Sequence, residues 1–90
     1  MTIYTTQDSR LGAFLLIHNV PFEGTELRYQ GEDDRVLLRF IIKDEGELQK
    51  LKRDFFEGGT VPALAYSNAM KTVMHAIREA RELAREAAQS

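Results

Sequence analysis

Hydrophobic and polar residues alternate along residues 35–43 and predict the central strand of a sheet. Val36, Leu38, Phe40 and Ile42 fall on one side of such a strand, and this wholly apolar side is expected to form the floor of the core. The other side carries Arg35, Leu37, Arg39, Ile41 and Lys43. Large aliphatic residues at matched positions among cations are unusual for a solvated face. Another element or a partner is therefore expected to cover Leu37 and Ile41.

Residues 25–30 alternate in the same way and predict the strand that pairs with it. The sequence between them, residues 31–34, is typical of a four-residue turn. Pairing Gln30 with Arg35 then places Glu26 opposite Arg39 as a cross-strand ion pair and keeps the apolar residues on one face. Residues 2–5 are rich in β-forming side chains and predict a short edge strand.

A first helix is predicted over about residues 6–18. Thr5 or Thr6 is the expected N-cap, with Asp8 in the first turn beside the positive end of the helix dipole. Residues 11–17 are apolar almost all round, which indicates a buried helix. Gly12 within it is expected to let another backbone approach closely. Asn19 is expected to end the helix.

Two further helices are predicted over about residues 45–57 and 61–89. Asp44 followed by Glu47 forms a variant of the capping box at the start of the second helix. Gly58 and Gly59 are expected to end this second helix. Thr60 is the expected N-cap of the third helix, and Pro62 fits its first turn, where a missing N–H costs nothing.

The third helix carries an apolar stripe with spacings of four and three. Its members are Tyr66, Met70, Val73, Ile77, Ala80, Ala84 and Ala87. A helix over residues 61–89 is roughly 40 Å long at 1.5 Å per residue, whereas a domain of this size is only about 30 Å across. The end of this helix, residues 78–90, is therefore expected to protrude or to pack against another chain.

These elements together predict one α+β domain over residues 1–90, in which a small antiparallel sheet packs against three helices. The 90-residue chain has 12 basic and 14 acidic residues, and a net charge of -2 argues against nucleic-acid binding, which usually goes with a basic excess. The absence of cysteine excludes disulfides and cysteine-based zinc sites. The N-terminal residues lack the pattern of a signal peptide, and the apolar runs are too short for a bilayer, so a cytoplasmic protein is expected.

Two segments of the chain form recognisable motifs. The first is Tyr4-Thr5-Thr6-Gln7-Asp8 followed by the apolar residues 12–16, and the second is residues 55–63 followed by Tyr66, Ala69 and Lys71. With these motifs the chain resembles a family of small prokaryotic and phage proteins known only as a domain of unknown function. Arg39-Phe40 matches the Phe-rich second strand of the family's hairpin. The charged tail after Ile77 departs from the family pattern. The resemblance implies a phage or mobile-element setting and implies no known catalytic or binding residue.

Catalytic and metal-binding patterns are weak in this sequence. His18 and His75 are its only histidines, and each lies in a helical pattern where a structural role is the more common one. The glycines at residues 58–59 lack the Lys-Ser/Thr of a phosphate loop. We therefore predict no catalytic residue, no metal site and no cofactor, and we do not expect an enzyme.

The cationic side of the predicted hairpin is the candidate site. It consists of Arg28, Arg35, Leu37, Arg39, Ile41 and Lys43. A hydrophobic centre with an arginine-containing rim is typical of protein interfaces, and guanidinium groups also hold phosphates. The first hypothesis is a non-enzymatic, homo-oligomeric binding protein, such as a homodimer, from a phage or bacterial accessory gene, with a host protein as a further possible partner. The alternatives are a sponge for a small anionic or nucleotide ligand at a subunit interface and, third, a nucleic-acid-associated accessory protein.

Overall fold

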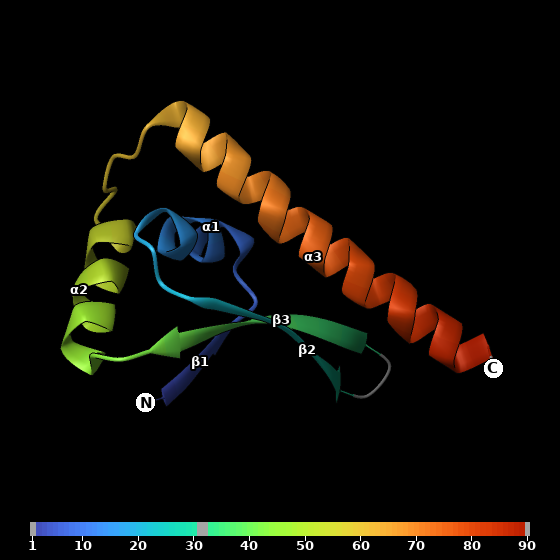
Figure 1. The fold of residues 1–90 in the computed structure, drawn as a ribbon. Helices are drawn as coiled ribbons and strands as arrows, with labels where there is room; N and C mark the ends of the chain where they lie inside the picture. Colours follow the sequence, from blue (N-terminus) through green and yellow to red (C-terminus); the bar gives the residue numbers. More distant parts are fainter. Residues whose placement is uncertain (1, 31–32, 90) are drawn as a thin grey trace.

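The α+β fold predicted from the sequence is confirmed by a computed structural model, which describes residues 2–30 and 33–89 (Figure 1). Its elements, in chain order, are β1 (Thr2–Thr6), α1 (Ser9–Ile17), β2 (Phe22–Gln30), β3 (Asp33–Ile42), α2 (Glu45–Phe56) and α3 (Ala63–Gln89). Of the turn predicted at residues 31–34, residues 31–32 lie outside the described residues, while Asp33 and Asp34 belong to β3.

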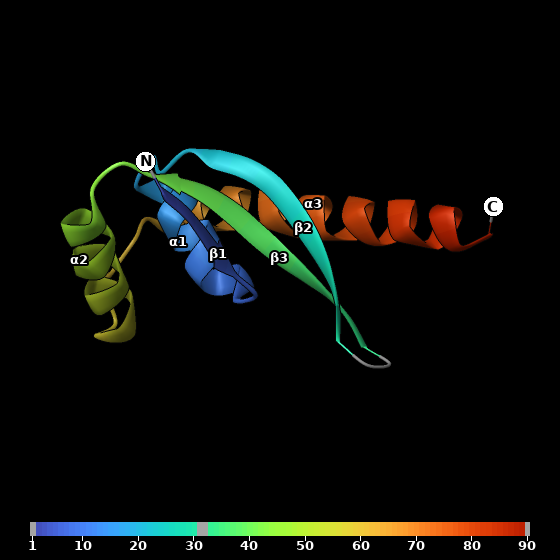
Figure 2. The same ribbon diagram turned by 90° about the horizontal axis from the view of Figure 1, so that it is seen from below.

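The three strands form one antiparallel sheet in the order β1-β3-β2, so the predicted edge strand is present and the predicted central strand lies in the middle. Helices α1 and α3 cover one face, and α2 lies at the end of the sheet (Figures 1 and 2). The alternating apolar residues of β3 point into this core as predicted, and Phe40 and Leu38 are completely buried. Phe22 of β2 packs its ring 5.2 Å from that of Phe40.

The predicted hairpin register was wrong by two residues. Gln30 pairs with Asp33 rather than with Arg35, and Glu26 lies opposite Leu37 rather than opposite Arg39. The strands therefore run closer to the turn than expected, because Asp33 and Asp34 continue β3. A shift of two residues keeps every side chain on its predicted face, since the side-chain period of a strand is two.

Helix α1 begins later than predicted because Asp8, not Thr5 or Thr6, is its N-cap. The Asp8 carboxylate accepts hydrogen bonds from the backbone N–H groups of Arg10 and Leu11, at 2.9 and 3.2 Å. At the other end Asn19 adopts a left-handed φ of 62°. Its N–H donates to the carbonyl of Leu16, and the N–H of Val20 donates to that of Leu15. This pair of bonds is a Schellman motif, which confirms the predicted stop.

Helix α2 has the predicted cap, because Asp44 accepts from the N–H groups of Gly46 and Glu47. Gly58, with a φ of 83°, ends it as predicted. The predicted start of α3 was wrong by two residues. The helix begins at Ala63, and the carbonyl of Pro62 accepts from the N–H of Tyr66, so Pro62 stands at the N-cap position and Thr60 lies outside the helix.

Gly12 of α1 does permit a close approach, although to side chains of the sheet rather than to a backbone. A methyl group added at Gly12 would lie 2.5 Å from Leu38 Cδ1 and 3.8 Å from the ring of Phe40. The absence of a side chain therefore lets α1 lie directly on β3, which fixes the height of the helical layer above the sheet.

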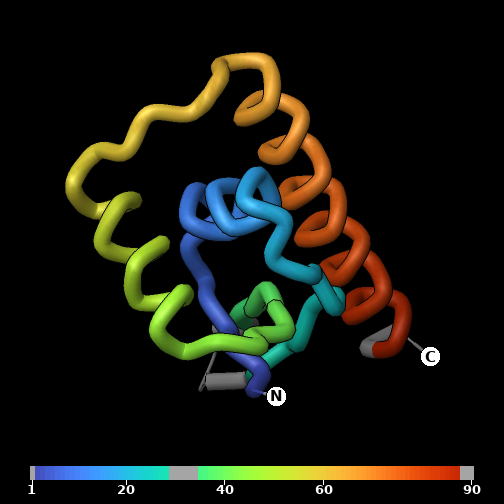
Figure 3. Tube along the Cα trace, turned by 60° about the vertical axis from the view of Figure 1, so that its left-hand side comes forward, coloured from blue at the N-terminus to red at the C-terminus, as the bar shows by residue number. Residues whose placement is uncertain are grey.

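Helix α3 extends along the molecule from one end to the other. Figure 3 shows α1 enclosed by α2, the connection after it and α3. Val73 and Ile77 of α3 are buried in the common core, and the last turns of the helix run past the ends of β2 and β3 (Figures 1 and 2). Within the described ranges, no helix combines the length and the apolar content that crossing a membrane requires.

Candidate interaction site

One face of the sheet carries none of the described helices, and we call it the bare face (Figure 2). Among the residues whose side chains the structure describes, the strand registers place the following on it: Ile3 and Thr5 of β1, Glu26 and Arg28 of β2, and Arg35, Leu37, Arg39 and Ile41 of β3. Five of the six residues predicted as a site therefore share this face. The sixth, Lys43, follows the end of β3.

Two arginines of the bare face lie directly opposite each other across neighbouring strands. Arg28 of β2 is the register partner of Arg35 of β3. Like charges in this position repel, so the pair does not stabilise the sheet. Arg28 Nε lies 3.2 Å from a carboxylate oxygen of Glu26, whereas among the described side chains Arg35 donates to the neutral amide oxygen of Gln7, at 3.3 Å. A guanidinium has five N–H donors, so both arginines keep donors for a further acceptor.

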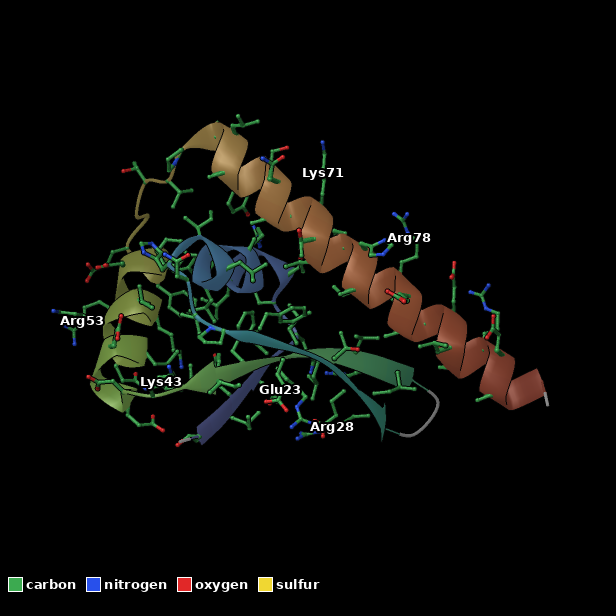
Figure 4. The ribbon with its side chains drawn as sticks, viewed as in Figure 1. Glu23, Arg28, Lys43, Arg53, Lys71 and Arg78 are labelled. Carbon is green, nitrogen blue, oxygen red and sulfur yellow. The ribbon has the colours of Figure 1, made fainter. Side chains whose placement is uncertain are left out.

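Arg39 is the third guanidinium of the bare face. Its Nη2 lies 3.6 Å from a carboxylate oxygen of Glu23, which stands at the β-bulge of β2. Its Nε atom is buried and has no hydrogen-bond partner among the described residues. Figure 4 shows Glu23 and Arg28 on the side of the sheet away from α1 and α3. The ion pair predicted between Glu26 and Arg39 is thus replaced by Glu26 with Arg28 and Glu23 with Arg39.

Of the two predicted kinds of cover for Leu37, another element or a partner, the single chain already supplies the first. Leu37 is only 5% exposed in it, although it does not belong to the main core cluster. Glu26 lies opposite it, and Arg35 and Arg39 flank it on the same face of β3. The aliphatic parts of such long side chains can shield an apolar neighbour while their charged ends stay in water.

The apolar part of the bare face lies instead at Ile3 and Ile41, which are register partners. Ile41 is half-buried, and Ile3 is 41% exposed. Ile3 was not among the predicted site residues. Its alternation with Tyr4 in a strand beside β3 was the available signal, because a residue one position from a core-facing tyrosine must point to the opposite face.

Lys43 was wrongly grouped with the three arginines. It lies beyond the end of β3, beside α2 and away from Arg28 (Figure 4). There it lines a cavity of about 170 Å³, together with His18 from the end of α1, Ile41, and Leu48 and Leu51 of α2. This cavity is smaller than the 300–1,000 Å³ that is usual for small-molecule sites.

The two histidines lie in different surroundings. His18 packs its ring 4.5 Å from that of Phe14. His75 is exposed on α3, with Nε2 3.6 Å from a carboxylate oxygen of Glu79. In the part of the chain that the structure describes, no group of three or more histidine, aspartate or glutamate residues is placed to hold a metal ion.

The bare face therefore carries three guanidinium groups and the buried Leu37, with an apolar pair at one side.

Comparison of the chain with protein-family models, with curated proteins and with solved structures finds no significant match.

Proposed function

We propose that this protein is a non-enzymatic interaction module whose bare face docks onto an acidic surface of a partner protein. The observation that carries the proposal is the direct opposition of Arg28 and Arg35 on the face that no helix covers. Repulsion between two such groups is relieved when carboxylates lie between them, and arginine pairs with carboxylates in a directed, bidentate way.

The charge of the bare face supports an acidic partner. Among the side chains that the structure describes there, Arg28, Arg35 and Arg39 outnumber Glu23 and Glu26. This excess of guanidinium groups over carboxylates suits an acidic partner. Ile3 and Ile41 add an apolar contact beside the arginines, as protein interfaces commonly have.

The shape of the site favours a macromolecule over a small ligand. The arginines stand on the outer surface of a sheet, whereas the cavity of about 170 Å³ is lined by Lys43 and His18. Small molecules are usually held in concave pockets that bury most of their surface. The sponge for a nucleotide-type ligand is therefore the weaker alternative, because a single copy of the chain offers no such pocket around these arginines among the described cavities.

Nucleic acid is a poorer fit for the same face. Proteins that bind single strands on a sheet stack bases on exposed aromatic side chains. Here Tyr4, Phe22 and Phe40 lie on the core face, and no described side chain of the bare face is aromatic. The net charge of -2 also opposes a polyanion.

A selection experiment tests the proposal with a defined probe. A displayed library of peptides and small domains, diverse in charge, is selected against the immobilised full chain. We expect enrichment of sequences rich in aspartate and glutamate, with binding that weakens as salt rises. The Arg28→Ala/Arg35→Ala variant should lose at least tenfold in affinity for the selected binders.

The matched control is Lys50→Ala/Arg53→Ala, which removes the same charge from exposed positions of α2. This control variant should keep an affinity within about twofold of that of the unaltered chain, because exposed charges far from a contact contribute little. Equal losses in both variants would show a general charge effect and contradict the proposal. Calorimetry with mono-, di- and cyclic nucleotides covers the alternative, since binding that needs Arg28 and Arg35 would favour the sponge.

The phage or bacterial accessory setting implied by the family resemblance belongs to this proposal. A small module of this kind acts by occupying a surface of a larger protein. The proposal requires no catalytic residue and no cofactor.

A further inference from the structure

The sheet has two outer edges, and only one of them carries features that prevent further strand pairing. The edge at β2 has a β-bulge between Phe22 and Gly24, with a φ of 120° at Gly24, and it carries Glu23, Glu26 and Arg28. Bulges and charged side chains are the usual means by which proteins protect an edge strand.

The edge at β1 has none of these features. Its sequence, Thr-Ile-Tyr-Thr-Thr over Thr2–Thr6, contains no charge, no proline and no glycine, and no register shift interrupts its pairing with β3. Within residues 2–30 and 33–89, no backbone hydrogen bond outside the sheet involves β1. The outer backbone groups of this strand are thus free to pair with another strand.

We propose that the β1 strands of two copies pair antiparallel, which joins two three-stranded sheets into one six-stranded sheet. The strand suits a second copy because it is self-complementary. An antiparallel pairing centred on Tyr4 uses all five residues, with Thr2 opposite Thr6 of the second copy, Ile3 opposite Thr5, and Tyr4 opposite Tyr4. Aromatic, threonine and β-branched pairs of this kind stabilise neighbouring strands, and the five residues of the strand itself carry no charge.

This pairing keeps each face of the sheet intact. Ile3 and Thr5 lie on the bare face, opposite Ile41 and Arg39 of β3. In the pair of sheets, Ile3 of one copy gains Thr5 of the other as a neighbour on the same face. The half-exposed isoleucine is then covered further, and the two bare faces become one continuous surface. A two-fold axis at Tyr4 relates the copies, so the contact is closed and ends at a dimer.

The first test is the mass of the full chain, by sedimentation equilibrium over a range of concentrations. We expect twice the 10.3 kDa mass of one chain. Ile3→Lys/Thr5→Lys should shift the mass to that of the monomer, because each new lysine meets another directly across the pair. Ile3→Lys/Thr5→Glu should remain a dimer, because the same pairing now sets lysine against glutamate. Both positions are on the surface or half-exposed, and circular dichroism confirms that each variant folds.

Cross-linking tests the register itself. The chain has no cysteine, so introduced thiols are the only ones present. Ile3→Cys and Thr5→Cys chains, mixed and oxidised, should give a covalent dimer, whereas each alone should give little. Direct cross-strand neighbours lie within disulfide reach, and residues two positions along lie at or beyond its limit of about 7 Å.

Three results would overturn the proposal. They are a monomeric mass for the unaltered chain, a dimer that survives Ile3→Lys/Thr5→Lys, and a mixture that cross-links no better than its separate components. The docking of an acidic partner depends on Arg28 and Arg35, which lie on β2 and β3. The two proposals can therefore fail independently.

Discussion

Arg28 lies directly opposite Arg35 on neighbouring strands, on the face of the sheet that no helix covers. A sheet gains nothing from this arrangement, because opposed like charges destabilise strand pairing. Glu26 pairs with Arg28, while the described contact of Arg35 is to the neutral amide of Gln7. The arrangement is better explained by recognition of an acidic partner than by the stability of the fold.

Replacing one member of the pair should therefore stabilise the isolated protein and weaken its binding. For Arg35→Gln we expect a gain of roughly 0.2–1 kcal/mol in the free energy of unfolding at low salt, which shrinks as salt rises. Urea unfolding at two salt concentrations measures it. Lys50→Gln on the exposed side of α2 is the control and should change stability less. A loss of stability in Arg35→Gln would show that the pair is not repulsive.

The core depends most on the aromatic residue at its centre. Phe40→Ala should lower the free energy of unfolding by about 3–5 kcal/mol, since the ring is fully buried against α1 and the neighbouring strands. His75→Ala, at an exposed site on α3, should change it by less than about 0.5 kcal/mol. Chemical unfolding of each variant measures both changes in free energy. Loss of partner binding in His75→Ala at unchanged stability would place a functional site on α3 instead.

The contact between α1 and β3 makes a second sharp prediction. Alanine is a better helix former than glycine by about 1 kcal/mol, yet Gly12→Ala should be destabilising by about 1–3 kcal/mol because the core is already full at Leu38. Leu38→Val removes the crowded Cδ1 atom. In a double-mutant cycle the two changes together should cost clearly less than their sum. If the two changes in the free energy of unfolding simply add, α1 instead moves away from β3 to make room for the new methyl group.

Alternation of apolar and polar residues was sufficient to predict the faces of the strands but not their register. The register depends on how many residues form the turn, and the acidic residues Asp33 and Asp34 fit a turn and a strand end equally well by composition. Either count keeps Leu27 and Val36 on the core face, so the hydrophobic pattern did not distinguish them.

The candidate site was predicted in part for the same reason. Arg28, Arg35 and Arg39 share a face because of the period of two, whereas the position of Lys43 depends on where β3 ends. The burial of Leu37 depends on its surroundings in the folded chain, which a linear pattern does not describe. Ile3 was missed because its role follows from the pairing of β1 with β3.

Substitution of Leu37 should unfold the protein rather than disrupt an interface between intact chains. Leu37→Glu places a carboxylate where the side chain is 5% exposed, and burying an unpaired charge is strongly unfavourable. We expect a large fall in the melting temperature, measured by circular dichroism, with any change of mass following from unfolding. A variant that melts at the original temperature but changes mass would show that Leu37 belongs to an interface after all.

The length of α3 has a consequence for cooperativity. Val73 and Ile77 anchor the helix in the shared core, whereas Leu83, Arg85 and Glu86 of its last turns are exposed. Opening the core would have to release α1, the sheet and the middle of α3 together, while the final turns can fray alone. Amide hydrogen exchange should separate the two: slow and uniform through Val73 and Ile77, and fast after Ala84. The middle of the helix therefore makes the domain a single folding unit. The end of the same helix is the part of the domain that is least protected from exchange.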